Sequence, residues 1–80
     1  MRVTIVPSDF IVCIDGLCRG NIDMSTVNPD VHAVQWYDTH GEVETLDPVT
    51  RRPINVTIYS LDDYTAVIDQ WYALGETPPA

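Results

Sequence analysis

The stretch VHAVQWYDTHGEVETL, residues 31–46, carries the clearest β-strand pattern in the chain. Residues 31–37 are rich in β-branched and aromatic side chains that alternate with polar ones. Asp38, Thr39 and His40 then lead to Gly41, which is available for a positive φ in a hairpin loop. Residues 42–46 can pair back against the first strand. The stretch therefore predicts an antiparallel β-hairpin.

Turn signals on either side of this hairpin delimit further short strands. We expect these strands at residues 3–6, 10–14, 17–20 and 54–59. Asp15-Gly16 is the two-residue signature of a type I′ turn, so residues 10–14 and 17–20 should form a hairpin of their own. Residues 21–30 contain Ser, Thr, Asn and Pro and predict an irregular connection.

The hydrophobic period changes near the C-terminus. Apolar residues recur at steps of three and four, which predicts one helix with a wide apolar stripe; they are Leu61, Tyr64, Val67, Ile68, Trp71, Tyr72 and Leu74. Ser60 can cap its start with Asp63 at the third position, whereas Gly75 and Pro78-Pro79 should end it. We predict a single α+β domain over residues 1–80. It is an antiparallel meander of five to six short strands, with one C-terminal helix (about 60–75) packed on one face.

The charge balance is strongly acidic. The chain has 12 Asp and Glu against 4 Arg and Lys, a net charge of −8. Such a surface repels phosphate backbones, so direct nucleic-acid binding is not expected. Its acidity is consistent with solubility, with complementarity to a basic protein, or with mimicry of nucleic acid. No apolar run approaches the ~20 residues that span a bilayer, and no signal peptide is recognised, so a location in the cytoplasm is expected.

The only two cysteines flank the Asp15-Gly16 turn. In that hairpin Cys13 opposes Cys18 in a non-hydrogen-bonded pair, where Cα atoms lie about 4.5 Å apart. This distance is at the short end of the range that a disulfide tolerates. A reducing cytoplasm favours free, facing thiols, and the redox state stays open.

Neither a metal site nor an active site is indicated. A zinc site would have to combine the cysteines with His32 and His40, and their spacing does not fit a zinc finger. Alternation instead places His32 on one strand face with Val34 and Trp36, as a partly buried structural histidine. There is no phosphate-binding loop, no nucleophile elbow and no lysine. We therefore expect no catalytic residues, no cofactor and no metal.

Two adjacent Trp-Tyr pairs are the candidate interface residues. Because neighbouring strand residues point to opposite faces, Trp36 and Tyr37 cannot both enter one core. Trp36 and Trp71 are expected to build the core, with Tyr37 and Tyr72 at its rim. The outward members would then suit a protein interface, where Tyr and Trp are enriched.

Several segments together resemble small proteins encoded in the tail modules of bacteriophages and prophages. The segments are the Asp15-Gly16 hairpin, the hairpin HAVQWY…GEVE, and the helix with Trp71 followed by the ending GETPPA. That ending is similar to the C-termini of tail fibre and tail fibre assembly proteins. The resemblance implies a role near the tail tip or fibres, and it carries over no catalytic residue.

Two classes of function follow as hypotheses. The first is a non-enzymatic tail component or tail assembly factor that binds other phage tail proteins or itself, in the host cytoplasm during assembly or in the virion tail. The alternative is a small acidic inhibitor of a host defence enzyme, of the anti-CRISPR or nucleic-acid-mimic type. An inhibitor of that type predicts acidic residues gathered on one face, whereas a structural protein predicts dispersed ones.

Overall fold

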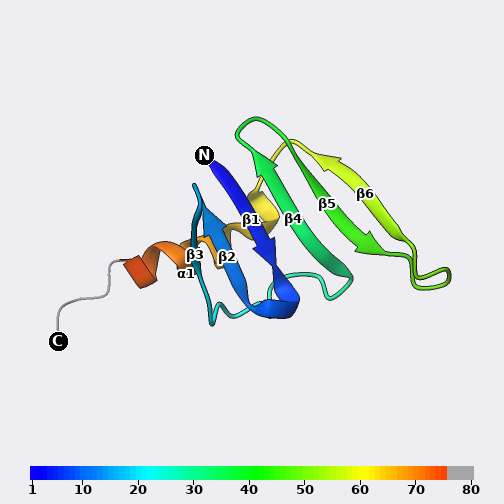
Figure 1. The fold of residues 1–80 in the computed structure, drawn as a ribbon, viewed down its shortest axis with the longest axis horizontal. Helices are drawn as coiled ribbons and strands as arrows, with labels where there is room; N and C mark the ends of the chain where they lie inside the picture. The colour runs from blue at the N-terminus through cyan, green and yellow to red at the C-terminus, as the bar shows by residue number, and fades with distance from the viewer. Residues whose placement is uncertain (76–80) are drawn as a thin grey trace.

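The computed structural model describes residues 1–75 and contains one antiparallel sheet with one C-terminal helix (Figure 1). The elements along the chain are β1 (Arg2–Val6), the 3-10 turn η1 (Pro7–Asp9), β2 (Ile11–Ile14), β3 (Leu17–Arg19), β4 (Val31–Tyr37), β5 (Gly41–Leu46), β6 (Pro53–Ile58), the 3-10 turn η2 (Asp62–Tyr64) and α1 (Thr65–Gly75). The predicted α+β class and the C-terminal position of the helix are confirmed.

The sheet consists of two three-stranded meanders joined side by side. Its strand order is β3-β2-β1-β4-β5-β6. The chain therefore leaves the edge strand β3 and returns through residues 20–30 to place β4 beside β1. The connection has no helix or strand of its own, as its composition predicted.

One face of the sheet carries the core. Val3 and Ile5 of β1, Val12 of β2 and Val34 of β4 share this face and are almost fully buried. α1 packs against β2 on this side, so it lies over the β1–β3 half of the sheet (Figure 1). The complete buried cluster is Val3, Ile5, Val12, Ile14, Ile22, Val27, Val31, Val34, Trp36, Val43, Tyr64, Val67, Ile68 and Trp71.

The two predicted hairpin turns differ in whether the expected glycine takes the positive φ. Asp15 and Gly16 have φ of 50° and 86°, which confirms the predicted type I′ turn. In the β4–β5 loop the positive φ, 87°, falls on Asp38 and not on Gly41, contrary to prediction. Gly41 begins β5, where a Cβ would collide with the Gln35 carbonyl oxygen and contact the Trp36 ring. The glycine is needed for close packing and not for the turn.

The helix begins later than predicted. Ser60 Oγ accepts a hydrogen bond from the Asp62 amide at 3.1 Å, but residues 62–64 form a 3-10 turn, and α1 starts at Thr65. Asp63 is therefore part of the turn and does not occupy the third helical position. Gly75 is the last residue of α1, and Pro78-Pro79, with the rest of the GETPPA ending, lies outside the described residues.

Candidate interaction surfaces

The two cysteines are bonded to each other on the face of the sheet opposite α1. Cys13 and Cys18 are direct partners in the β2–β3 ladder, and their Cα atoms lie 3.9 Å apart. The predicted register is confirmed. The free thiols that we favoured are not found, because directly opposed side chains place both sulfur atoms within bonding reach. A hollow of about 610 Å³ lies beside the disulfide, and Thr4 and Gln35 are among the residues that line it.

The histidines do not join the cysteines. β4 has an extra residue between Val31 and Ala33 in its pairing with β5, so His32 does not share the face of Val34 and Trp36 as predicted. His32 Nδ1 lies 3.6 Å from Glu44 Oε1 on the outer face. His40 lies beyond the other end of β4 and contacts Thr39 Oγ1 at 3.1 Å. Within residues 1–75 there is no cluster of three or more metal-ligating side chains.

The four aromatic candidates separate as the alternation predicted. Trp36 and Trp71 are buried in the core, whereas Tyr37 and Tyr72 are exposed. The two tyrosines approach the first residues of the chain from different elements. The Tyr37 ring lies 5.6 Å from the Arg2 guanidinium carbon, and the Tyr72 hydroxyl lies 3.6 Å from Met1 Sδ.

The N-terminal amino group fixes this end of the molecule. It is 2.6 Å from Asp38 Oδ1, and this hydrogen bond raises the pKa of the amino group and lowers the pKa of Asp38. We call Met1, Arg2, Tyr37 and Tyr72 the N-terminal rim. Sequence reasoning identified its tyrosines but not their contacts with Arg2 and Met1, because the rim is assembled from three distant segments.

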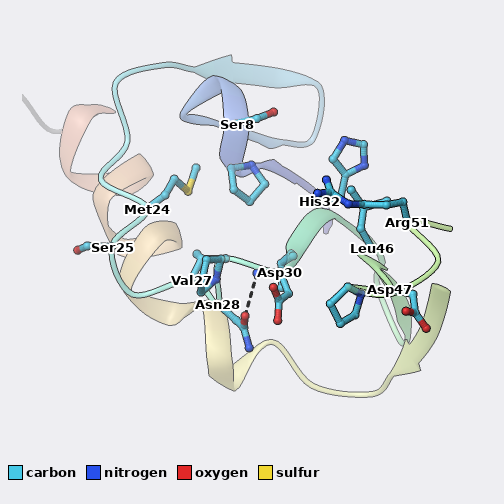
Figure 2. A pocket seen from close by; sticks show the side chains of 14 residues that line it. Ser8, Met24, Ser25, Val27, Asn28, Asp30, His32, Leu46, Asp47 and Arg51 are labelled. Carbon is cyan, nitrogen blue, oxygen red and sulfur yellow. Dashed lines mark hydrogen bonds between the residues drawn. The ribbon is translucent and has the colours of Figure 1, made fainter. Parts of the chain in front are cut away.

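An open groove of about 730 Å³ lies at the opposite end of the sheet (Figure 2). It runs between the 21–30 connection and the loop after β5, and apolar side chains such as Met24, Val27 and Leu46 line it. The groove could not be predicted from the sequence, because its walls come from loops whose path depends on the whole sheet.

Side-chain carboxylate and amide oxygens in the groove accept hydrogen bonds from the backbone amides of nearby turns. Asn28 Oδ1 accepts a hydrogen bond from the Asp30 amide at 2.9 Å, which Figure 2 shows as a dashed line. Asp47 Oδ1 accepts from the Val49 amide at 2.7 Å and the Thr50 amide at 3.1 Å. The bonds from Thr50 and Val49 lower the pKa of the Asp47 carboxyl. These groups stabilise loops and do not converge on a substrate position.

An apolar row at the β6 edge is left uncovered by the helix. Ile54, Val56 and Ile58 oppose Thr45, Val43 and Gly41 of β5, so they lie on the core face. α1 does not reach this part of the sheet (Figure 1), and Ile54 and Val56 remain 44% and 51% exposed, whereas Ile58 is partly buried and packs against the core cluster. We call Ile54, Val56 and Ile58 the β6 row. The strand at residues 54–59 was predicted, but not that the helix would leave one face of it uncovered.

The acidic residues are dispersed. Of those within residues 1–75, only Glu42 and Glu44 lie on strands, and only Asp69 lies in α1. The others occupy turns at both ends of the sheet, where several bind backbone amides. Asp15 Oδ1 accepts from the Arg2 amide at 2.9 Å, and Asp23 Oδ1 accepts from the Ser25 amide at the same distance. Most acidic residues in the described part of the chain therefore lie in turns and loops and not on one face of the sheet.

No helix in the described part of the chain is long and apolar enough to cross a membrane. Comparison of the chain with protein families, with curated proteins and with solved structures finds no match. The candidate surfaces therefore have to be interpreted from their own geometry.

Proposed function

We propose that this chain is a non-enzymatic, protein-binding component of a bacteriophage tail, located at the tail tip or fibres, or a factor that assembles them. The observation that carries the binding role is the uncovered β6 row on a sheet whose other half is packed under a helix. Exposed apolar side chains in a row are typical of protein-protein contact surfaces. The tail assignment rests on the sequence resemblance.

The polar groups of the groove support a binding role over a catalytic one. Within the described residues, Asp47 and Asn28 are engaged with backbone amides. His32 Nδ1 lies 3.6 Å from Glu44 Oε1, so its charged contact is with a carboxylate and not with a nucleophile. A hydrolytic or transfer reaction needs a nucleophile and a base that meet at a reacting atom.

The inhibitor hypothesis receives less support. A nucleic-acid mimic needs acidic groups in a continuous array on one face. Here the carboxylates of Asp15 and Asp38 are at one end of the sheet, and those of Asp30 and Asp47 are at the other. Each of these positions belongs to a turn.

The test is the composition of phage particles. The gene is tagged in the phage or prophage that encodes it, and purified particles are quantified by mass spectrometry. A fixed copy number per particle identifies a virion component. Absence from particles, with tailless or fibreless particles after gene deletion, identifies an assembly factor. Deletion that leaves particle number, tail structure and host adsorption unchanged would overturn the proposal.

The N-terminal rim provides a sharper version of the same test. Tyr37→Ala and Tyr72→Ala remove exposed aromatic rings from the rim, and Tyr59→Ala removes one that is 78% exposed outside it. If the rim contacts a tail protein, the two rim variants should reduce incorporation or assembly, and the Tyr59 variant should not. Equal behaviour of all three variants would exclude the rim as the contact.

A further inference from the structure

The two edges of the sheet differ in how they are protected. The β3 edge is a strand of only three residues, Leu17–Arg19, and the helix contacts it through Trp71, whose Nε1 donates a hydrogen bond to the Leu17 carbonyl oxygen at 3.0 Å. At the other edge, β6 pairs with β5 along its whole length. Within residues 1–75, no hydrogen bond joins the outer side of β6 to another segment. An unpaired strand edge is a template for another strand.

The β6 edge is also uncharged. Residues 53–60 read PINVTIYS and contain no Asp, Glu, Lys or Arg, although the chain carries 12 acidic residues. Protected edges usually present a charge or a bulge, whereas here Pro53 occupies only the first position of the strand. The edge is a place where two copies of an acidic protein can meet without opposing charges at the contact.

From these features we propose that two copies of this chain associate through β6, antiparallel, with Val56 opposite Val56 of the second copy. The result is a continuous twelve-stranded sheet across a two-fold axis. Such self-association does not depend on the proposed role in a phage tail, and either can fail without the other.

The strand is self-complementary in this register. When Val56 lies on the two-fold axis, Ile54 opposes Ile58 of the second copy and Asn55 opposes Thr57. Directly opposed residues share a face, so the β6 rows of the two copies form one apolar strip. On the other face, the side-chain amide of Asn55 meets the hydroxyl of Thr57 of the second copy. A shift by one residue would place apolar side chains opposite polar ones.

Shifts by two residues are less favourable. One of them places Ile58 opposite Arg52 of the second copy, and the other places Ile54 opposite Ser60. Each therefore replaces an apolar cross-strand pair with a mismatched one, and only the register centred on Val56 keeps three apolar pairs. The sequence of the edge thus selects a single alignment.

Long-range repulsion does not prevent this contact. The acidic residues of the neighbouring strand β5 are Glu42 and Glu44, which oppose Thr57 and Asn55. In the dimer they are separated from their counterparts by three strand spacings, about 14 Å. This separation exceeds the Debye length of about 8 Å at physiological salt. The helix also leaves this edge open, since it lies over the other half of the sheet (Figure 1).

The test is sedimentation of the full chain over a range of concentrations. We use about 5 to about 500 µM protein, because a contact smaller than the ~1,200 Å² of a standard interface binds weakly. The wild-type chain should shift from monomer to dimer over this range. A chain that remains monomeric at the highest concentration would overturn the proposal.

A matched pair of variants locates the contact. Val56→Lys puts two like charges on the two-fold axis and should weaken the dimer at least tenfold. Val49→Lys introduces the same charge at a loop residue that is 88% exposed, outside the edge, and should leave the dimer intact. Dimerisation that survives Val56→Lys, or that both variants weaken equally, would show that another surface is used.

A measurement on the unmodified chain tests the contact without relying on the folding of the variants. Amide hydrogen exchange should slow with concentration in β6 while the amides of β3 keep their rates. Protection that increases outside β6, or uniformly along the chain, would contradict the edge-to-edge arrangement. Circular dichroism checks that both variants retain the wild-type fold.

Discussion

The guanidinium carbon of Arg19 lies 3.9 Å from the centroid of the Trp71 ring, and Arg19 Nη1 donates a hydrogen bond to the Trp71 carbonyl oxygen at 2.5 Å. The same tryptophan donates through Nε1 to the Leu17 carbonyl oxygen. These contacts fasten the C-terminal helix to the edge strand β3. The short strand thereby gains tertiary support in addition to its single neighbour in the sheet.

Arg19→Ala should destabilise the fold. The substitution removes a cation–π contact and a charged hydrogen bond in a partly buried position, and we expect a loss of about 1–2 kcal/mol in unfolding free energy. Arg52→Ala is the matched control, because Arg52 makes no ion pair or ring contact within residues 1–75. Urea unfolding of both variants provides the measurement. Equal losses in the two variants would contradict the role of the Arg19–Trp71 contact.

Reduction of the Cys13–Cys18 disulfide should lower stability but preserve the fold. The bond closes a very short loop, for which the chain-entropy model gives about 2 kcal/mol. The hairpin itself is set by Asp15 and Gly16, whose positive φ values belong to the type I′ turn. Urea unfolding with and without reductant measures the loss, and a Cys13→Ser/Cys18→Ser variant should no longer respond to reductant. Loss of the β2–β3 amide signals in NMR spectra after reduction would show that the bond, and not the turn, holds the hairpin.

Gly41→Ala should be more harmful than Gly20→Ala. A Cβ at position 41 meets the Gln35 backbone and the buried Trp36 ring, whereas a Cβ at position 20 meets nothing within 4 Å. Because the backbone oxygen cannot move freely, we expect Gly41→Ala to cost about 1–3 kcal/mol. Gly20 does not have a positive φ, so Gly20→Ala should be neutral or slightly stabilising. Thermal unfolding of the two variants compares them, and similar melting temperatures would refute this account of Gly41.

Local signals in the sequence predicted most of the fold. Asp15-Gly16 fixed one hairpin, and alternation along residues 31–37 correctly separated Trp36 from Tyr37, because both depend only on neighbouring residues. The failures arose where distant residues decide the outcome. Gly41 was assigned to the turn, although its small size is required by Trp36. His32 was assigned to the core face, but the irregular pairing with β5 turns it outward.

The candidate surfaces were harder to predict than the strands. The apolar alternation at Ile54, Val56 and Ile58 is visible in the sequence and indicates a strand with one apolar face. Whether that face is covered depends on where α1 lies across the sheet. The contacts of Trp71 with Arg19 and Leu17 place the helix at the β3 end, far from β6. The open edge is thus a consequence of tertiary packing that no short sequence window contains.

The loop after β5 should lose stability in acid through Asp47. Backbone hydrogen bonds from Thr50 and Val49 to its carboxylate lower the folded-state pKa below 3.8, the ordinary value. A lowered folded pKa means that the unfolded chain binds the proton more tightly. The contribution of Asp47 is therefore fully present above pH 3.8, and it is lost as the pH falls through the folded pKa.

Two variants isolate this effect. The difference in unfolding free energy between wild type and Asp47→Ala should be largest near neutral pH and shrink in acid. Asp47→Asn keeps an oxygen acceptor but does not titrate, so its difference from Asp47→Ala should change much less with pH. NMR titration of the wild-type carboxyl measures the pKa directly. A value for Asp47 at or above 3.8 would mean that the amides of Val49 and Thr50 do not stabilise its charged form, and the loop would then need another explanation for its conformation.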